Sequence, residues 1–262
     1  TSGNAWLPLR PPHMPDRFLT ALPVFNEARH VVPVLGQVLR HSRHVLVVDD
    51  GSTDGTSAIL RAFPQVDVAR HETNRGYGAA LLTAFDYAIA NGYDRVITID
   101  CDGQHEPQRI PQFAEAARHT DIVSGSRYLR DFPGDRAAPA ARRRINHIVT
   151  AELNRRLGLE LTDAFCGFKA YRVEALARLE LSEPGYAMPL ELWVRAAYHG
   201  LQIVELPVPR IYLDERRSFG GALDDPHTRL EYYHLVLDRS MASLATPNEG
   251  LWAGTLCQEL AG

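Results

Sequence analysis

Two carboxylates separated by one residue stand at the end of an apolar run. Residues 100–105 read Asp-Cys-Asp-Gly-Gln-His, and they follow Arg95–Ile99, which predicts a buried β-strand. Carboxylate and amide oxygens are hard ligands of the kind that Mg²⁺ or Mn²⁺ binds, and such an ion takes its other ligands from water and substrate phosphates. Asp100, Asp102 and Gln104 are therefore candidate ligands of a divalent cation that holds a diphosphate. The competing interpretation is that both aspartates only form the turn after the strand.

The composition is that of an ordinary globular protein. The chain has 262 residues, of which 45% are hydrophobic and 23% charged, so one α/β domain with a sizeable core is expected. The formal net charge of −4 argues against general nucleic-acid binding. The stretch 127–144 is nevertheless rich in arginine, which indicates a local anionic partner.

The cysteines and the hydropathy pattern indicate a reducing compartment. Cys101, Cys166 and Cys257 are widely spaced and form no Cys-x-x-Cys motif, so neither a disulfide framework nor a zinc site is expected. We find no signal-peptide pattern and no run of about 20 apolar residues that would span a membrane. We therefore expect a cytoplasmic protein that is at most peripheral to the membrane.

Strands and helices alternate along the first half of the chain. Strands are predicted at 18–24, 44–48, 66–69, 95–99 and 121–124, with helices between them. This alternation predicts a mostly parallel sheet with helices on both faces, in which ligands bind outside the carboxyl ends of the strands. Four polar loops fall at those ends: Phe25 and its neighbours, Asp49–Asp50, Asn74–Gly78 and Asp100–Gln104.

The second half is organised differently. A helix is predicted at about 141–157, with an apolar stripe formed by Ile145, Ile148, Val149 and Leu153. Further elements are expected as a strand at 165–171, a helix at 189–198, a strand at 202–207, a loop at 209–227 and a helix at 228–244. The expected organisation is a disordered arm (1–16), one domain (17–244) and a flexible tail (245–262). Within the domain, residues 17–125 form a first half and residues 126–244 a second half.

Taken in order, five motifs resemble those of the family 2 glycosyltransferases of GT-A fold, and in particular the polyprenol-phosphate (dolichol-phosphate) mannose synthases. They are Pro23–Glu27, Asp49–Thr56, Asn74-x-Gly76-x-Gly78, Asp100–His105 and Gly125–Tyr128. Each motif alone is weak, but their order and spacing are specific. The resemblance covers about residues 18–215. It implies that 17–244 is one catalytic domain, with 17–125 as the nucleotide-sugar half and 126–244 as the acceptor half.

The resemblance implies a site for a GDP- or UDP-hexose donor. The residues that it assigns to the nucleotide are Pro23, Phe25, Glu27, Asp49, Asp50, Asn74, Gly76, Asp100 and Cys101. It also implies that Mg²⁺ or Mn²⁺ binds Asp100, Asp102 and Gln104, and that Arg127 lies near the phosphates. Asp100, Asp102 and Arg127 are accordingly the implied catalytic residues. Many relatives carry tyrosine at the position of Phe25, which can still stack on a base.

The acceptor implied by the resemblance is a polyprenyl phosphate. Its oxygen is already deprotonated near neutral pH, so it needs a cationic pocket and no general base. The corresponding positions are Arg142, Arg143, Lys169, Arg216, Arg217 and Ser218. Three consecutive arginines on a helix, Arg142 to Arg144, cannot all face one pocket.

Two other activities stay open from the sequence. Transfer to a glycan or soluble hydroxyl would need a base, for which Asp163 and Glu191 are candidates. A nucleotide-sugar-binding protein without turnover is the other alternative. For the lipid acceptor, peripheral membrane contact through 127–144, 209–227 or 228–244 is expected, with a membrane protein or a second copy of the chain as a further partner.

Overall fold

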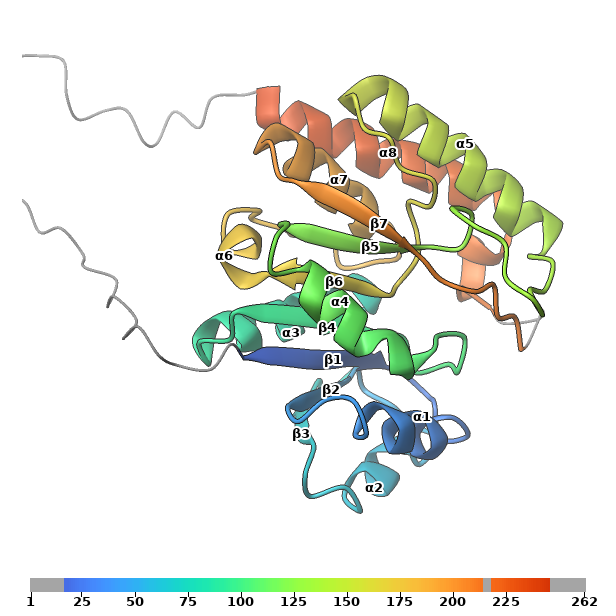
Figure 1. The fold of residues 1–262 in the computed structure, drawn as a ribbon. Helices are drawn as coiled ribbons and strands as arrows, with labels where there is room; N and C mark the ends of the chain where they lie inside the picture. Colours follow the sequence, from blue (N-terminus) through green and yellow to red (C-terminus); the bar gives the residue numbers. More distant parts are fainter. Residues whose placement is uncertain (1–16, 214–217, 246–262) are drawn as a thin grey trace, which may run out of the picture.

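One seven-stranded sheet runs through the part of the chain that the structure describes (Figure 1). The structure is a computed structural model, and it describes residues 17–213 and 218–245. The strand order is β3-β2-β1-β4-β6-β5-β7. The arm predicted at 1–16 and the tail after residue 245 lie outside the described residues.

The first four strands are parallel, as the alternation of strands and helices predicts. They are β1 (Phe18–Val24), β2 (Val45–Asp49), β3 (Asp67–Arg70) and β4 (Arg95–Thr98). The helices between them are α1 (Val31–Val38), α2 (Thr56–Leu60) and α3 (Tyr77–Ala90). Since parallel neighbours point the same way, the loops after β1, β2 and β4 meet at one edge of the sheet.

The sheet changes direction at β6 (Lys169–Arg172). This strand is antiparallel to β4 on one side and to β5 (Ile122–Ser126) on the other, and β7 (Ile203–Pro207) then runs parallel to β5. The mostly parallel sheet is confirmed, but the strand predicted at 165–171 begins only at Lys169. Because β6 is reversed, the residues just before it lie at the edge where β4 ends, and Thr98 Oγ1 donates to the carbonyl of Gly167 at 2.9 Å.

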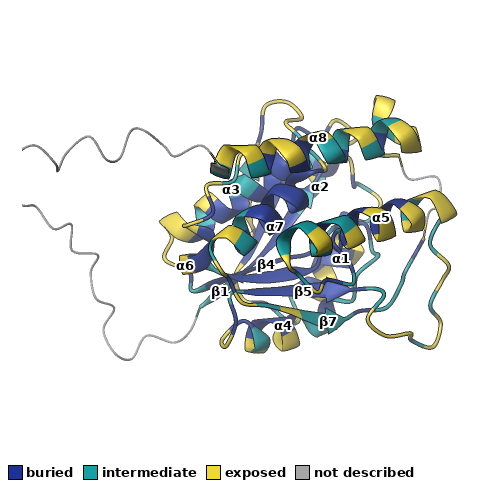
Figure 2. Cartoon of the chain, turned by 90° about the horizontal axis from the view of Figure 1, so that it is seen from above, coloured by how far each residue is buried: buried dark blue, intermediate teal, exposed yellow. Residues whose placement is uncertain are grey.

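The core lies in two layers, one on each face of the sheet. In β1, Leu19 and Ala21 belong to one layer, whereas Leu22 and Val24 belong to the other, because successive side chains of a strand point to opposite faces. Helices α3, α5 (Ala140–Leu157), α7 (Met188–Tyr198) and α8 (Pro226–Ala245) supply the first layer, and α1 and α4 (Ile110–Ala116) supply the second. Figure 2 shows α3, α5, α7 and α8 above the sheet and α4 below it.

Short segments complete the fold: 3₁₀ turns at Pro107–Arg109 and Gly221–Asp224, and α6 (Val173–Leu176). The apolar stripe predicted for α5 is right for Ile145, Val149 and Leu153, which are buried, and wrong for Ile148, which is 37% exposed. The last helix, α8, lies at the surface but buries Tyr233, Val236 and Leu237. It therefore packs as a core helix along one side only.

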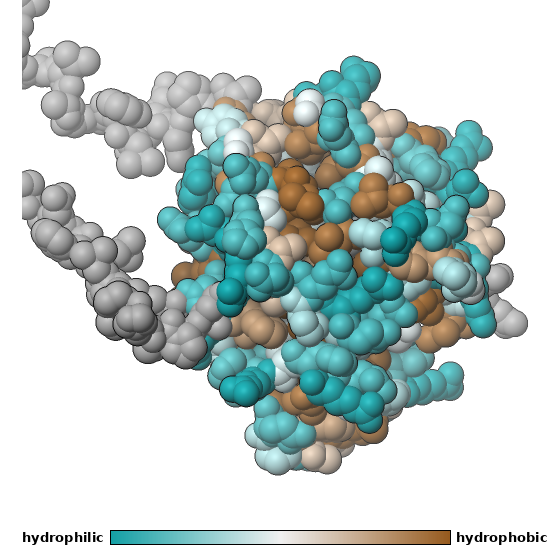
Figure 3. Space-filling view, in the orientation of Figure 1, coloured by the Kyte–Doolittle hydropathy of each residue, from teal (hydrophilic) through white to brown (hydrophobic). Residues whose placement is uncertain are grey.

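The outer surface is mixed in character. On the face drawn in Figure 3, hydrophilic side chains cover most of the area and hydrophobic ones show between them. Among the described residues, no helix has the length and apolar character that crossing a membrane requires.

Candidate functional site

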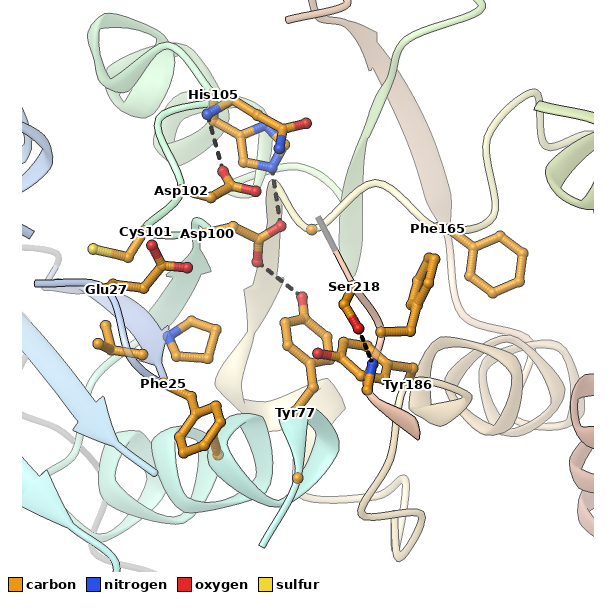
Figure 4. A pocket seen from close by; sticks show the side chains of 18 of the residues that line it. Phe25, Glu27, Tyr77, Asp100, Cys101, Asp102, His105, Phe165, Tyr186 and Ser218 are labelled. Atoms are coloured by element: carbon orange, nitrogen blue, oxygen red, sulfur yellow. Dashed lines mark hydrogen bonds and ion pairs between the residues drawn. The ribbon is translucent and has the colours of Figure 1, made fainter. Parts of the chain in front are cut away.

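A pocket of about 880 Å³ lies at the sheet edge where β1, β2 and β4 end (Figure 4). It brings together most of the residues singled out in the sequence. Those that line it are Pro23, Phe25, Glu27, Asp50, Asn74, Gly76, Asp100, Cys101, Asp102, Gln104, Arg127, Arg142 and Ser218. Asp49, Arg143 and Lys169 do not line it, and Arg216 and Arg217 lie outside the described residues. The pocket therefore joins the two halves of the chain in one site.

Asp100 is held from two sides. The Tyr77 hydroxyl donates to its Oδ1 at 3.1 Å, and the His105 Nε2 lies 3.2 Å from its Oδ2. The Asp100 side chain is 26% exposed. Burial, followed by the negative charge of Asp100, raises the pKa of Tyr77 well above its usual range, so the phenol keeps its proton and acts as donor.

A glycine allows the chain before β6 to approach Asp100 closely. A Cβ atom on Gly167 would lie 2.2 Å from Asp100 Oδ2, a distance at which one of the two must move. The absence of a side chain at Gly167 therefore leaves room for the Asp100 carboxylate next to the segment before β6.

The donor set fits a cation of the Mg²⁺ or Mn²⁺ type. Asp102 is 9% exposed and its Oδ1 accepts the backbone N–H of Gln104 at 2.9 Å, so the turn presents both aspartates and Gln104 to the same pocket. In residues 17–213 and 218–245, no three His, Cys, Asp or Glu side chains gather into a metal site. Mg²⁺ and Mn²⁺ suit a site with few protein ligands, because they take further ligands from water and phosphate oxygens.

Asp50 shapes the glycine-containing loop before α3. Its Oδ1 accepts from the backbone N–H of Arg75 at 2.8 Å and lies 2.6 Å from His71 Nδ1, and its Oδ2 accepts from the N–H of Gly76 at 2.9 Å. Asp50 is almost fully buried although it lines the pocket. It holds Asn74 and Gly76 at the pocket wall.

Asp49 was expected at the nucleotide and lies elsewhere. Its side chain is fully buried, and it accepts from the N–H of Ser52 at 2.9 Å and from the Ser57 hydroxyl, with Arg70 Nε 3.7 Å away. These contacts tie the loop after β2 to α2. Asp49 therefore does not line the pocket, because its carboxylate at the end of β2 is taken up by Ser52 and Ser57.

Arg127 reaches the pocket from a buried ion pair. Its Nε lies 2.7 Å from Asp163 Oδ2 and its second terminal nitrogen donates to Oδ1 at 3.0 Å. Asn146 donates to the same Oδ1 at 2.7 Å. Burial raises the pKa of Asp163, but the charge and hydrogen bonds of Arg127 outweigh this and lower it to about 2.

Neither carboxylate considered as a base is placed for that role. Asp163 is fully buried, paired with Arg127 and outside the pocket lining. Glu191 is also buried and accepts from the N–H groups of Ser182 and Glu183 at 2.8 and 2.7 Å. Both side chains therefore hold the structure together instead of facing a substrate.

The cationic side of the pocket differs from the prediction. Arg142 lines the pocket, with its guanidinium 4.9 Å from the ring of Phe219, whereas Arg143 is exposed and contacts His147. Arg229, which the sequence analysis did not single out, lies 4.3 Å from the same ring and also lines the pocket. The two guanidinium groups come from α5 and α8.

Lys169 was expected at the acceptor, but its side chain does not line the pocket. It is 2% exposed, its Nζ donates to the carbonyl of Cys166 and lies 5.5 Å from the ring of Trp193. Burial lowers its pKa, although nearby negative groups oppose the shift. As the first residue of β6, it points into the core below the pocket.

Several lining residues were missed because they are aromatic and lie far apart in the sequence. They are Tyr77, Phe165, Tyr186, Phe219 and Tyr233. Tyr77 lies inside the motif Asn74–Gly78, and the position of that motif at the ligand edge could have identified it. Tyr186 lies in the loop before α7, where no local pattern marks it.

Comparisons with known proteins identify the family of the chain. The family model described as "Glycosyl transferase family 2" matches residues 20–180. The undecaprenyl-phosphate mannosyltransferase of Micrococcus luteus is 35% identical over 223 residues, which cover 80% of this chain and 90% of that protein. The polyprenol monophosphomannose synthase of Mycolicibacterium smegmatis is 34% identical over 207 residues, covering 74% and 77%.

Solved structures share the fold at lower identity. Glucosyl-3-phosphoglycerate synthase from Mycobacterium tuberculosis, in complex with uridine diphosphate, superposes with a TM-score of 0.62 at 20% identity, covering 90% of this chain and 83% of that one. The same enzyme was crystallised with Mg²⁺ and uridine diphosphate. The predicted GT-A fold is thereby confirmed, and the chain belongs to glycosyl transferase family 2.

Proposed function

We propose that the protein transfers a hexose, mannose or glucose, from a nucleoside-diphosphate sugar to a polyprenyl phosphate, with inversion at the anomeric carbon. The observation that carries the proposal is a single pocket lined both by the carboxylate pair Asp100 and Asp102 and by the arginines at 127, 142 and 229. Relatives named for the transfer of sugars to polyprenyl phosphates support the same acceptor.

The chemistry follows from the charges of the two sides. An acceptor phosphate oxygen attacks the anomeric carbon while the bond from that carbon to the diphosphate breaks, and its electron pair leaves with the nucleoside diphosphate. Asp100, Asp102 and Gln104 would hold a Mg²⁺ or Mn²⁺ ion, which would supply positive charge to the leaving nucleoside diphosphate. The arginines attract the acceptor phosphate, and Phe25, which is 43% exposed at the pocket, offers a ring for stacking on the base.

No general base is needed in this reaction, because the acceptor phosphate is already an anion. This agrees with the positions of Asp163 and Glu191, which are buried and engaged. A hydroxyl acceptor would require a carboxylate placed at the pocket to remove its proton. Of the two bases considered for a hydroxyl acceptor, neither lines the pocket, whereas Arg142 and Arg229 line it and suit an anionic acceptor.

The test is a transfer assay on the full chain. GDP-mannose or UDP-glucose is incubated with Mn²⁺ and a short-chain polyprenyl phosphate, and lipid-linked hexose is the expected product. Asp102→Ala should lower turnover by at least about a hundredfold while the circular dichroism spectrum is kept. Release of nucleoside diphosphate without lipid product, or near-native turnover by Asp102→Ala, would contradict the proposal.

A lipid acceptor also implies contact with a membrane surface on the cytoplasmic side. Arg127 and Tyr212 are in contact, and the residues that follow them include the exposed Leu129 and Leu213. The arginines at 130, 143 and 144 are exposed as well. We propose that this basic and apolar rim docks on anionic lipid. The same assay with the acceptor in anionic vesicles should lose rate as salt rises, and an unchanged rate would contradict docking.

A further inference from the structure

The hydroxyl of Tyr77 hydrogen-bonds Asp100 at the pocket. Tyr77 begins α3, directly after the loop that Asp50 holds, and its hydroxyl donates to Asp100 Oδ1 at 3.1 Å. Figure 4 shows the Tyr77 ring rising from the helix toward the aspartate, with His105 on the opposite side. Asp100 thus receives a hydrogen bond from a different segment of the chain, the start of α3.

The Tyr77 ring is itself braced. It stacks on Tyr186, with ring centroids 5.7 Å apart and an interplanar angle of 13°. Tyr186 in turn meets the edge of Phe219 at 5.4 Å and 86°. Aromatic pairs in these geometries are favourable beyond their buried area.

The backbones beneath the two tyrosines are also in direct contact. The N–H of Ala79 donates to the carbonyl of Pro184 at 3.0 Å, and a Cβ atom on Gly78 would lie 2.2 Å from the carbonyl oxygen of Glu183. Glu183 is buried and accepts from the Tyr232 hydroxyl of α8. The start of α3 and the loop before α7 therefore sit at a fixed distance.

We propose that Tyr77 is a positioning residue for the reaction: its hydroxyl holds the Asp100 carboxylate in the orientation that a divalent cation and a diphosphate require, and Tyr186 holds the Tyr77 ring. This inference rests on the function proposed above. The Tyr77 hydroxyl holds Oδ1 and His105 lies at Oδ2, so the carboxylate is oriented before a ligand binds and less order must be gained on binding. Outer partners of metal ligands typically contribute about 10- to 100-fold to affinity.

The test is Mn²⁺ binding by Tyr77→Phe, measured by titration in the presence of GDP or UDP. This variant keeps the ring and its stack and removes only the hydroxyl. The dissociation constant for Mn²⁺ should rise about tenfold. A value within twofold of the unchanged protein would overturn the inference.

The chain offers a matched control on the same helix. Tyr87 also donates to a carboxylate, Asp67 Oδ2 at 2.8 Å, and also stacks on a tyrosine, Tyr93. Tyr87→Phe should leave Mn²⁺ binding unchanged. An equal loss in Tyr87→Phe would assign the effect to α3 stability and overturn the positioning role.

Two further variants separate positioning from packing. In the Asp100→Asn background, Tyr77→Phe should add no further loss, because the two act through one contact. Tyr186→Ala should weaken Mn²⁺ binding, whereas Tyr186→Phe, which keeps the stack, should not. If the losses in Mn²⁺ binding caused by Tyr77→Phe and Asp100→Asn were fully additive, the positioning role of Tyr77 would be contradicted. Unchanged Mn²⁺ binding in Asp102→Ala would instead contradict the proposed metal site.

Discussion

Arg142 and Arg143 are neighbours in the chain and lie in different environments. Arg142 lines the pocket beside Phe219, and Arg143 faces solvent next to His147. If the acceptor is a phosphate, Arg142→Ala should raise the KM for the polyprenyl phosphate about tenfold or more, since a charge-assisted contact contributes about 1.5 to 3 kcal/mol. The KM for the donor should change less than twofold in steady-state assays.

Arg143→Ala is the control for this prediction and should leave both KM values unchanged. Arg142→Lys keeps the charge but loses the fork of the guanidinium, so an intermediate acceptor KM is expected. An equal rise in the donor and acceptor KM of Arg142→Ala would remove Arg142 from the acceptor side.

Some pocket residues could be predicted from the sequence, whereas the choice between two adjacent aspartates could not. Asp100, Asp102 and Gln104 were predictable because a polar turn after a buried parallel strand must open at the ligand edge. Asp49 and Asp50 could not be told apart, since the choice depends on where β2 ends. β2 runs on to Asp49, which is in register with Val24, so only Asp50 enters the loop at the pocket.

The contact between α3 and the loop before α7 depends on a glycine. A Cβ atom on Gly78 would lie 2.2 Å from the Glu183 carbonyl oxygen and 2.8 Å from the Pro184 carbonyl carbon, and both are backbone atoms. Gly78→Ala should therefore lower the free energy of unfolding by about 1 to 3 kcal/mol through overpacking. Urea denaturation followed by Trp fluorescence measures this change.

Gly36 supplies the comparison that isolates the contact. It lies within α1, and a Cβ atom there would meet nothing within 4 Å. Gly36→Ala should raise the free energy of unfolding by about 0.5 to 1 kcal/mol through helix propensity. If Gly78→Ala were also stabilising, the close approach of the two segments would be refuted.

Helices and parallel strands were predictable as elements because their periodicity is local. The direction of β6 was not, because a four-residue strand carries the same pattern in either direction. Lys169 was misplaced for this reason. Its side-chain direction is set by pairing with Thr98 and Ser124, which only the assembled sheet defines.

The ion pair of Arg127 and Asp163 links segments 36 residues apart and should appear in the stability of the whole protein. The pKa of Asp163 is lowered to about 2, below its value near 3.9 in an unfolded chain. Its stabilising effect is thus complete above pH 4 and is lost as the pH falls toward 2, to a total of about 2 kcal/mol.

Asp163→Asn removes this titration while it keeps a side chain of the same shape. The difference in the free energy of unfolding between the parent protein and Asp163→Asn should shrink as the pH falls from 5 toward 2. Denaturant titrations at several pH values check this. A difference that stays constant over that range would show that the carboxylate of Asp163 does not carry the effect.

The joining of distant segments was the least predictable property of the molecule. Tyr77 and Tyr186 stack across more than a hundred residues of chain, and Arg229 reaches the pocket from the last helix. Such contacts depend on helix packing against the sheet, which no local pattern encodes. The two halves of the site were predictable, but the aromatic residues that join them were not.

The reversed strand β6 also limits how this enzyme can be recombined with its relatives. The boundary predicted at 125/126 falls inside β5, whose partners are β6 and β7. A chimera joined there would split one strand between two parents, and β4 would receive its neighbour β6 from the foreign part. A working exchange of the second half must therefore be joined before residue 121 and must preserve the pairing of Thr98 with Lys169, because β6 couples the two halves through the sheet.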